Sequence, residues 1–397
     1  MPSTWLSADE AARALGVKPE TLYAYVSRGL VERERIPGDR RSRYRRADVE
    51  RLAARQRGGS GRAGGLEIIV ESSLTLLEPD GRLYYRGWDV EDAARSASFE
   101  QVATWLWLGR RDDVPAFDAP ANLTRDAHRV AAALGDAPVD RIRALLAAVR
   151  STDPLRHDRR PEAVADHGRA IVSLAIAALR PRDAAVDDSV AARLWSKLTA
   201  RKPTRRDLEL LDATLILLAD HELAASTLAA RVAASTWADP YLVVLAGLAT
   251  LGGPLHGGAS EQARTLVAEI RDRGVSAAEA VDERLAGGSL IPGFGHRVYL
   301  TRDPRADVLL EDLLARRPTP TSRATADLLE VMRSRGLPFP NVDVALALLT
   351  EAYGMVPNAG IIIFAVARIA GWLAHAIEEY EHRLRFRPRA AYVGVRP

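Results

Sequence analysis

The chain has 397 residues, of which 47% are hydrophobic and 27% are charged. This composition is typical of a folded globular protein and excludes a disordered, low-complexity chain. The absence of cysteine excludes disulfides, thiolate catalysis and Cys-ligated zinc.

The formal net charge of +3 is distributed unevenly. Residues 1–62 contain 14 Lys and Arg against 8 Asp and Glu, a balance of +6, so the remaining residues carry −3. The basic character therefore belongs to the N-terminal part of the chain.

Residues 1–56 are predicted to form a compact module with two short helices joined by a tight turn. Ser7 is a candidate N-cap, Glu10 completes a capping box, and apolar residues follow at helical spacing until Gly16. A second short helix is predicted over residues 21–27. A strand pair around residues 37–39 and a helix over residues 47–54 follow.

This order, with the segments WLSADEAARALGVKPETLYAYVSRGLV and RSRYRRADVERL, resembles the winged helix-turn-helix modules of the MerR and excisionase type. The resemblance implies DNA contact by the second helix and by a basic wing. The wing arginines are Arg40, Arg41, Arg43, Arg45 and Arg46. The alternative is a solvated basic face on a module for protein contact, because a basic patch alone does not establish DNA binding.

Residues 57–65, RGGSGRAGG, predict a flexible linker because they combine five glycines with a serine. In the main body, residues 66–397, the runs 66–77 and 82–85 flank a Pro-Asp-Gly turn and predict a β-hairpin. Nearly everything after it has helical periodicity. The expected fold is mainly α, with one small hairpin at its entrance.

The longest apolar stretches do not predict a membrane span. Residues 242–251 are too few to cross a bilayer, and Arg368 interrupts residues 361–377. The first residues do not resemble a secretory signal, so a cytoplasmic location is expected.

Three of the eight histidines lie in contexts that indicate a site. His221 lies in LILLADHELAAST, His256 in LGGPLHGGASEQA and His296 in IPGFGHRVYLTRDPRADV. Glycines around a histidine leave the ring and the backbone open to a ligand, and a loop that enters a helix directs N–H groups toward an anion.

The other histidines receive no role. His128, His157 and His167 lie in polar surroundings and are expected at the surface, and His375 and His382 are expected to pack or to face solvent on a C-terminal helix.

Asp343, in the segment FPNVD, precedes an apolar helix predicted over residues 344–349. It is either a helix-start carboxylate satisfied by backbone donors or a general base. The motif alone favours the first interpretation.

Beyond the linker, the sequence resembles the citrate synthase family from about Gly65 to Gly394. The similar segments are GGLEIIVESSLTLLEPDGRLYYRGWDVEDAA, FEQVATWLWLGR, LADHELAASTLAARVAAST, GGPLHGGASEQA, PGFGHRVYLTRDPRA, FPNVD, FAVARIAGWLAH and RFRPRAAYVG. The resemblance implies a two-domain all-α body with a smaller CoA-side subdomain over about residues 257–345.

The family pattern implies that His256 donates a hydrogen bond to the thioester carbonyl of acetyl-CoA while Asp343 removes a methyl proton. A neutral histidine at a helix start suits this role because the helix dipole disfavours its protonated form. His296 matches the histidine that polarises the 2-oxo carbonyl of oxaloacetate. Attack then gives a citryl-CoA-like thioester, whose hydrolysis releases CoA.

The same resemblance implies cations for the dicarboxylate, which arginine binds bidentately. Arg305, Arg368 and Arg387 match the family's carboxylate-binding arginines. His221 matches a further substrate-contacting histidine, and Phe364 matches an aromatic at the acetyl end of the pocket. In the family the arginine at the position of Arg387 reaches into the neighbouring subunit's site, so a homodimer is implied.

The loop that resembles the family's CoA-adenine segment consists of Pro292, Gly293, Phe294 and Gly295. Many members carry Lys or Arg four residues after the histidine, whereas this chain has Leu300. Arg302 or Arg297 is expected to substitute at the CoA phosphates.

After Asp343 the family usually continues with aromatic and small polar residues, but this chain reads VALAL. Smaller side chains leave extra room beside the reacting carbons unless repacking fills it. The leading prediction is a citrate synthase that uses acetyl-CoA and oxaloacetate, and a 2-methylcitrate synthase that uses propionyl-CoA is the alternative. A DNA-binding regulator with a metabolite-sensing body is the alternative of a different class.

No metal and no nicotinamide or flavin cofactor is expected. The sequence has no GxGxxG segment after a strand, and the candidate histidines lack a close metal-ligand spacing. The CoA thioester is a substrate in this prediction.

Overall fold

The computed structural model describes residues 5–15, 22, 26, 31–35, 42–49, 69–78, 80–112, 114–253, 256–316, 318–382, 386 and 394. The chain divides into two compact units, Met1–Glu71 and Ser72–Pro397. The predicted linker, most of the predicted second helix, and Arg40, Arg41 and Arg387 lie outside the described residues.

The first unit contains a small antiparallel sheet and a helix, α1 (Ala8–Leu15). Strands β1 (Trp5–Ser7), β2 (Arg33–Arg35) and β3 (Ser42–Arg45) pair in the order β1-β3-β2. The predicted capping box is confirmed, since Ser7 Oγ accepts from Glu10 N at 3.3 Å and Glu10 Oε2 accepts from Ser7 N at 2.8 Å. Strand β1 was not predicted because three residues are too few to show an alternating pattern.

The second unit begins with the predicted hairpin, β4 (Thr75–Leu77) and β5 (Leu83–Tyr85), which β6 (Trp88–Asp89) extends to three strands. The prediction of a strand over residues 66–77 was too long, because residues 69–74 are not in a strand. Ser72 and Ser73 instead donate hydrogen bonds to the Glu378 carboxylate on the last helix.

The rest of the second unit consists of helices and the loops that connect them, which confirms the mainly α fold class. Its helices are α4 (Val90–Ser96), α5 (Phe99–Leu108), α6 (Ala121–Ala133), α7 (Pro138–Val149), the 3₁₀ turn η1 (Arg150–Thr152), α8 (Pro161–Ala177), α9 (Val190–Leu198), α10 (Arg205–Leu218), α11 (Ala225–Ser235), α12 (Pro240–Leu251), α13 (Ala259–Asp272), α14 (Ala277–Ala286), α15 (Pro304–Leu314), α16 (Pro320–Ser334), α17 (Val342–Ala352) and α18 (Ala359–Tyr380).

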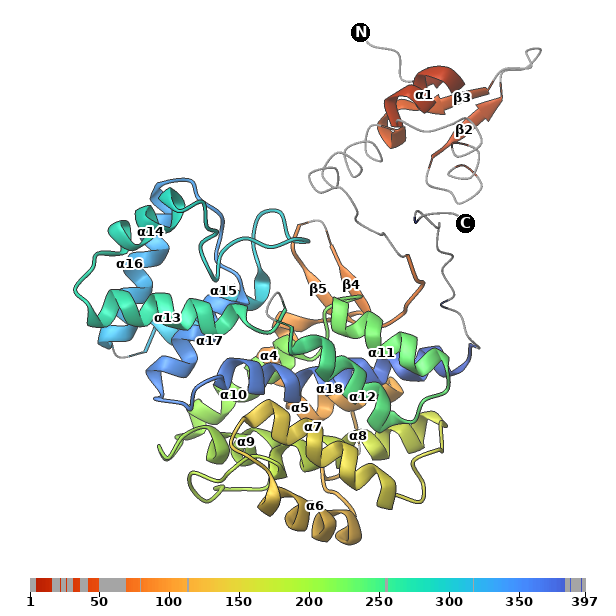
Figure 1. The fold of residues 1–397 in the computed structure, drawn as a ribbon. Coiled ribbons are helices and arrows are strands. Elements are labelled where there is room, and N and C mark those ends of the chain that lie inside the picture. The colour runs from red at the N-terminus through yellow and green to blue at the C-terminus, as the bar shows by residue number, and fades with distance from the viewer. Residues whose placement is uncertain are drawn as a thin grey trace. The chain divides into compact units, whose positions relative to one another are not determined.

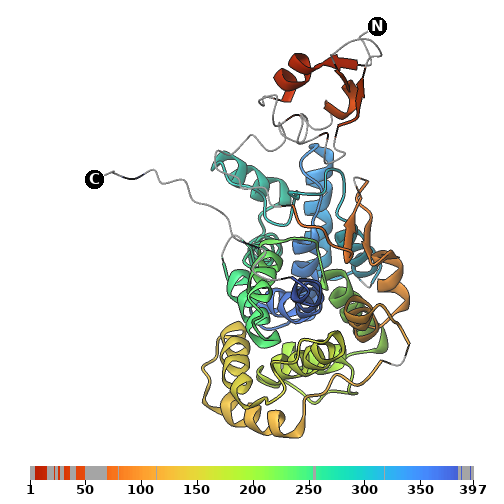
Figure 2. The ribbon, with the colours of Figure 1, turned by 90° about the vertical axis from the view of Figure 1, so that its right-hand side faces the viewer.

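Helix α18 runs through the middle of this unit, and α5, α8, α10, α11 and α12 pack around it (Figures 1 and 2). Among the described residues it is the one helix long and apolar enough to cross a membrane, but 83% of its most apolar stretch is buried in the protein. Gly247 of α12 makes close packing possible, because a Cβ there would lie 2.6 Å from the Trp372 ring of α18.

A second, smaller hydrophobic cluster joins α13, α14, α16 and one face of α17. Its buried members include Leu266, Val281, Leu328 and Ala347. Figure 1 shows these helices grouped to one side of α18. The candidate site residues come from both groups of helices.

Candidate active site

The structure brings together candidate residues that are far apart in the sequence. His221 follows α10, His256 precedes α13, and His296 lies in the loop before α15. The others are Arg305 on α15, Asp343 on α17, and Phe364 and Arg368 on α18.

Three rings are in contact at the centre of this group. The His221 and His296 centroids are 5.2 Å apart, and the Tyr299 ring lies 5.3 Å from the first and 4.7 Å from the second. Tyr299 Oη is 3.1 Å from His221 Nε2. Burial lowers the pKa of His221 well below its ordinary value, and the nearby Arg305 and Arg368 act in the same direction. His221 is therefore neutral near pH 7.

The tautomer of His296 follows from its backbone neighbours. The N–H groups of Val298 and Tyr299 donate to Nδ1 at 3.1 and 3.2 Å, so the ring proton is on Nε2. Burial lowers the pKa of His296 to about 4, assisted by Arg305. Nη2 of Arg305 lies 3.5 Å from Nε2. Two donors therefore converge, and one acceptor oxygen could satisfy both.

Arg305 is held by Asp303, which is fully buried. The two oxygens of Asp303 accept from Arg305 Nε at 2.9 Å and from Nη2 at 2.8 Å. Asp303 Oδ2 also accepts from the backbone N–H of Val342 at 3.0 Å, which ties α15 to the start of α17. Burial raises the pKa of Asp303, but Arg305 outweighs it and holds this pKa below its ordinary value.

Arg368 is buried with an incomplete set of partners. Its Nε donates to the Leu218 carbonyl at 2.8 Å, but neither Nη1 nor Nη2 has a hydrogen-bond partner. Its guanidinium lies 4.5 Å from the centroid of the Phe364 ring. Burial lowers the pKa of Arg368, and the negative charge of Asp220 is the largest effect that opposes this lowering. Buried, unpaired guanidinium donors indicate a site for an anionic ligand.

His256 also lies near Phe364, with 6.1 Å between the ring centroids. Its Nε2 is 2.9 Å from Ser226 Oγ. Burial lowers the pKa of His256, and Arg368 lowers it further. This histidine is therefore also neutral near pH 7.

Asp343 is the second residue of α17, which begins two residues earlier than predicted because Asn341 caps it. Asn341 Oδ1 accepts the Asp343 backbone N–H at 2.9 Å. Burial raises the pKa of the Asp343 carboxyl to about 6, although Arg305 opposes this. Such a shift is typical of a carboxylate that acts as a general base.

The loop of Pro292, Gly293, Phe294 and Gly295 is fastened to the residues that precede α17. Gly293 O accepts from Asn341 N at 2.9 Å, and Gly295 N donates to Phe339 O at 2.7 Å. Gly293 and Gly295 have φ of 85° and 75°, which favours glycine. Part of this loop's backbone is therefore already bonded within the protein.

The two arginines expected near the CoA phosphates differ in their surroundings. Arg302 forms ion pairs with Glu91 and Asp307, whereas Arg297 and Leu300 are exposed.

Two wing arginines of the first unit lie on β3. Arg43 and Arg45 are exposed and flank the buried Tyr44. Arg45 Nη1 forms an ion pair with Glu32 Oε2 at 2.8 Å.

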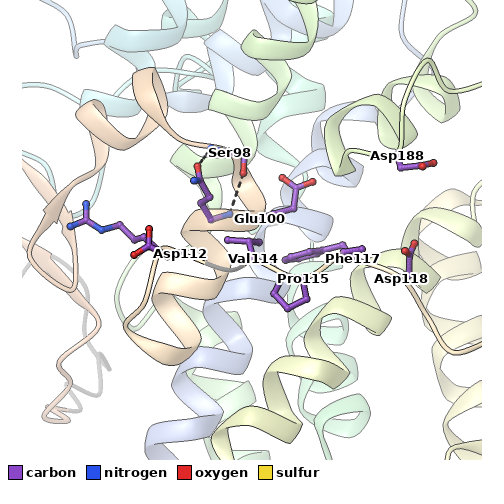
Figure 3. Close-up of a pocket in the computed structure, with 11 residues that line it drawn as sticks. Ser98, Glu100, Asp112, Val114, Pro115, Phe117, Asp118 and Asp188 are labelled. Carbon is purple, nitrogen blue, oxygen red and sulfur yellow. Dashed lines mark hydrogen bonds between the residues drawn. The ribbon is translucent and has the colours of Figure 1, made fainter.

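A surface pocket of about 660 Å³ at the start of α5 includes none of these candidate residues (Figure 3). Ser98, labelled in the figure, forms the capping box of α5 with Gln101. Glu100 Oε1 accepts from the Val190 N–H at 2.8 Å. Helix capping thus accounts for these polar groups.

The sequence did not lead us to predict Tyr299, Asp303 and Asp220 as site residues. Their positions next to His221 or between His296 and Arg305 were the only indication in the sequence. The expectation that His167 lies at the surface is wrong, because it is buried with Nε2 3.3 Å from Asp153. Among the described residues, no group of three or more His, Asp or Glu is placed to hold a metal ion.

Two family models match the sequence. The model of the citrate synthase C-terminal domain matches residues 65–389, and a helix-turn-helix domain model matches residues 5–57. The citrate synthase of Haloferax volcanii is 33% identical over 83% of this chain and 95% of its own length. The 2-methylcitrate synthase of Shewanella oneidensis is 29% identical over 82% of this chain and 93% of its own length.

Solved structures agree with these relatives. The citrate synthase of Thermotoga maritima superposes with a TM-score of 0.68 at 31% identity, covering 83% of this chain and 94% of that protein. A ternary complex of Thermoplasma acidophilum citrate synthase with carboxymethyl coenzyme A and oxaloacetate also has a TM-score of 0.68, at 28% identity, covering 83% of this chain and 95% of that protein. The chain therefore belongs to the citrate synthase family, whose members are acyltransferases that convert the acyl group into an alkyl group, and it carries an N-terminal helix-turn-helix domain.

Proposed function

We propose that the protein condenses acetyl-CoA with oxaloacetate and water to form citrate and CoA. The buried Arg368 carries this proposal, because both of its Nη nitrogens lack partners. A substrate carboxylate would supply the missing acceptors. Arg305 and the neutral His221 would contact the same dicarboxylate. The CoA thioester is a substrate, and the proposed chemistry uses no metal and no other cofactor.

Asp343 and His256 form the proposed acyl side of the site. The Asp343 carboxylate takes a proton from the methyl carbon of acetyl-CoA, and the electron pair moves onto the thioester oxygen. If Ser226 donates to His256 Nε2, the proton of the neutral ring is on Nδ1 and can be donated to that oxygen. Phe364 bounds the acetyl end.

His296 acts on the other substrate. Its Nε2–H polarises the 2-oxo carbonyl of oxaloacetate while the enol carbon attacks the carbonyl carbon. The new alkoxide takes a proton, and water then cleaves the C–S bond of the citryl-CoA thioester to release CoA. Neutral histidine donors suit these steps because they are fixed before charge develops.

The packing after Asp343 supports acetyl-CoA over propionyl-CoA. Val344 is buried, and a Cβ at Gly293 would lie 2.8 Å from Val344 Cβ. Val344 therefore packs against the loop of Gly293. This contact supports compensated repacking rather than extra room beside the acyl group.

Because Arg302 already has two carboxylate partners, Arg297 is the better candidate for the CoA phosphates. Residues 292–295 are proposed to contact the adenine.

Two apolar stripes, each with two exposed and two half-buried residues, support a homodimer. On α11 the stripe consists of Ala225, Leu228, Ala229 and Val232, and on α12 it consists of Leu242, Leu245, Ala246 and Ala249. Both follow the i, i+3, i+4, i+7 pattern on helices that pack against each other. Contiguous exposed apolar surface marks an interaction site. Arg387 would complete the neighbouring subunit's site.

The helix-turn-helix domain is proposed to bind DNA through residues 1–56, with 57–65 as a linker to the synthase body and 257–345 as its CoA-side subdomain. The exposed Arg43 and Arg45 support this, although Glu32 partly neutralises Arg45. The family's soluble fold supports a cytoplasmic location.

The direct test is a thiol-release assay on the purified full-length protein with oxaloacetate and either acetyl-CoA or propionyl-CoA. We expect kcat/KM to favour acetyl-CoA by about tenfold or more, because one methylene contributes about 1 to 3 kcal/mol of discrimination. A preference for propionyl-CoA would establish the 2-methylcitrate synthase. Absence of turnover with both would favour the metabolite-sensing regulator.

The pH dependence tests Asp343 as the base. A carboxyl with a pKa of about 6 is protonated below that pH and cannot accept a proton, so kcat/KM should fall as pH decreases through about 6 and level off above it. Asp343→Asn should lower kcat by about 10²- to 10⁴-fold, with oxaloacetate binding by calorimetry retained. Near-normal turnover of this variant would refute the assignment.

Mixed dimers test Arg387. Arg387→Ala and Asp343→Asn should each be inactive alone, but a mixed dimer contains one site with both residues intact if Arg387 acts across the interface. Random exchange should restore about a quarter of wild-type activity. No recovery, with mixed dimers demonstrated by native mass spectrometry, would place Arg387 in its own subunit's site.

Replacement of Arg41, Arg43, Arg45 and Arg46 by alanine tests the DNA-binding domain. Fluorescence-anisotropy titrations at several salt concentrations should show weaker binding and a smaller salt slope, by about 1 per lost phosphate contact, with thiol release unchanged. If the unaltered protein does not bind DNA at low salt, a protein-contact module replaces this assignment.

A further inference from the structure

A buried chain of polar residues contacts α18 at His375, two turns after Arg368, and no proposed catalytic step uses it. It links Arg231 on α11, His375 on α18, Asp220 after α10 and Thr75 on β4. Arg231, Asp220 and His375 are at most 1% exposed.

Three hydrogen bonds along successive turns of α18 hold the end of α10 in place. Arg368 Nε donates to Leu218 O at 2.8 Å, and Gly371 N donates to Ala219 O at 3.0 Å. One turn further, His375 Nε2 lies 3.3 Å from Asp220 Oδ2. Gly371 is required here, because a Cβ would lie 2.3 Å from Asp220 Oδ1.

Arg231 determines the tautomer of His375. Its Nη1 is 2.7 Å from His375 Nδ1, and because a guanidinium only donates, Nδ1 must accept. The ring proton is therefore on Nε2, which donates to Asp220. Glu378 and Glu379 hold Arg231 in place through their carboxylates at 2.8 and 2.9 Å.

The Asp220 carboxylate is restrained through one of its oxygens, Oδ2. Besides His375, Oδ2 accepts from Thr75 Oγ1 at 2.5 Å and from the Glu222 N–H at 3.2 Å. Burial raises the pKa of Asp220, but His375 and Arg368 outweigh it and keep the group ionised. Arg368 and Asp220 both lie where α18 contacts the end of α10. Neither the Arg368 Nη nitrogens nor Asp220 Oδ1 has a hydrogen-bond partner, so the two groups do not pair with each other.

We propose that His375, oriented by Arg231, is a positioning residue that holds Asp220 back from Arg368 and so keeps the guanidinium donors available for the substrate carboxylate. Asp220 then supplies a negative charge that compensates Arg368 without hydrogen bonding to its Nη nitrogens. Because His221 directly follows Asp220 in the chain, the restraint on Asp220 also limits the position of His221. This inference rests on the proposed function, since it assigns how that site retains its affinity for oxaloacetate.

The test compares His375→Leu with His375→Gln in the full-length protein. Leucine removes the donor to Asp220, so the Kd of oxaloacetate by calorimetry and its KM should rise by at least about tenfold. The KM of acetyl-CoA and the kcat at saturating oxaloacetate should change less than about threefold. Glutamine can place an N–H near the position of Nε2 and should restore most of the affinity.

Two further variants separate positioning from folding. His167→Leu removes another buried histidine, whose Nε2 is also 3.3 Å from an aspartate, and it should lower the thermal midpoint without changing the oxaloacetate Kd. Thr75→Val removes the second side-chain restraint on Asp220 and should raise that Kd by about threefold. This conservative variant keeps the test available if His375→Leu does not fold.

An unchanged oxaloacetate Kd in both His375→Leu and Thr75→Val would overturn the positioning role. Equal losses for oxaloacetate and acetyl-CoA would do the same, since they indicate general disruption. If the unaltered protein binds oxaloacetate but releases no thiol, the proposed function fails while the calorimetric comparison still decides this inference. If it does not bind oxaloacetate, both fail.

Discussion

A buried guanidinium with two unpaired nitrogens is the constraint on which the rest of the site depends. Burying an ion costs on the order of several kcal/mol of desolvation free energy, unless nearby charges and hydrogen bonds offset this cost. Arg368 receives this compensation from the Leu218 carbonyl and from the charge of Asp220, both at the end of α10. Because α18 carries Arg368 and lies at the centre of the helical unit, the packing of the core also fixes the position of this cation.

The two described substrate arginines differ in how their guanidinium groups are paired. Asp303 binds Arg305 through two nitrogens, whereas Asp220 leaves both terminal nitrogens of Arg368 unpaired. The first arrangement gives rigidity, since Asp303 also accepts from Val342 and joins α15 to the helix of Asp343. The second arrangement leaves the two terminal nitrogens of Arg368 available to hydrogen bond with a ligand. With two cations nearby and little solvent, the histidines remain neutral, which suits hydrogen-bond donation to substrate oxygens.

Asn341 couples the acyl side of the site to the glycine loop. Its backbone N–H and side-chain amide donate to the carbonyls of Gly293 and Gly295, while its Oδ1 caps the helix of Asp343. A single side chain thus orients both the proposed base and the loop expected to contact CoA. The two glycines allow this because their positive φ would strain other residues.

The sequence by itself determined the mainly α class, the capping box at Ser7, the entrance turn and the motif residues, because these depend on local periodicity, caps and turn chemistry. It could not locate the third strands of the two small sheets, which are too short to carry a pattern. Only the tertiary structure placed Tyr299 against His221 and set the tautomer of His375, since these depend on contacts between segments more than 70 residues apart. The sequence also could not predict that His167 and His375 are buried. Exclusion of a side chain from solvent depends on which helices enclose it, and these helices are distant in the chain.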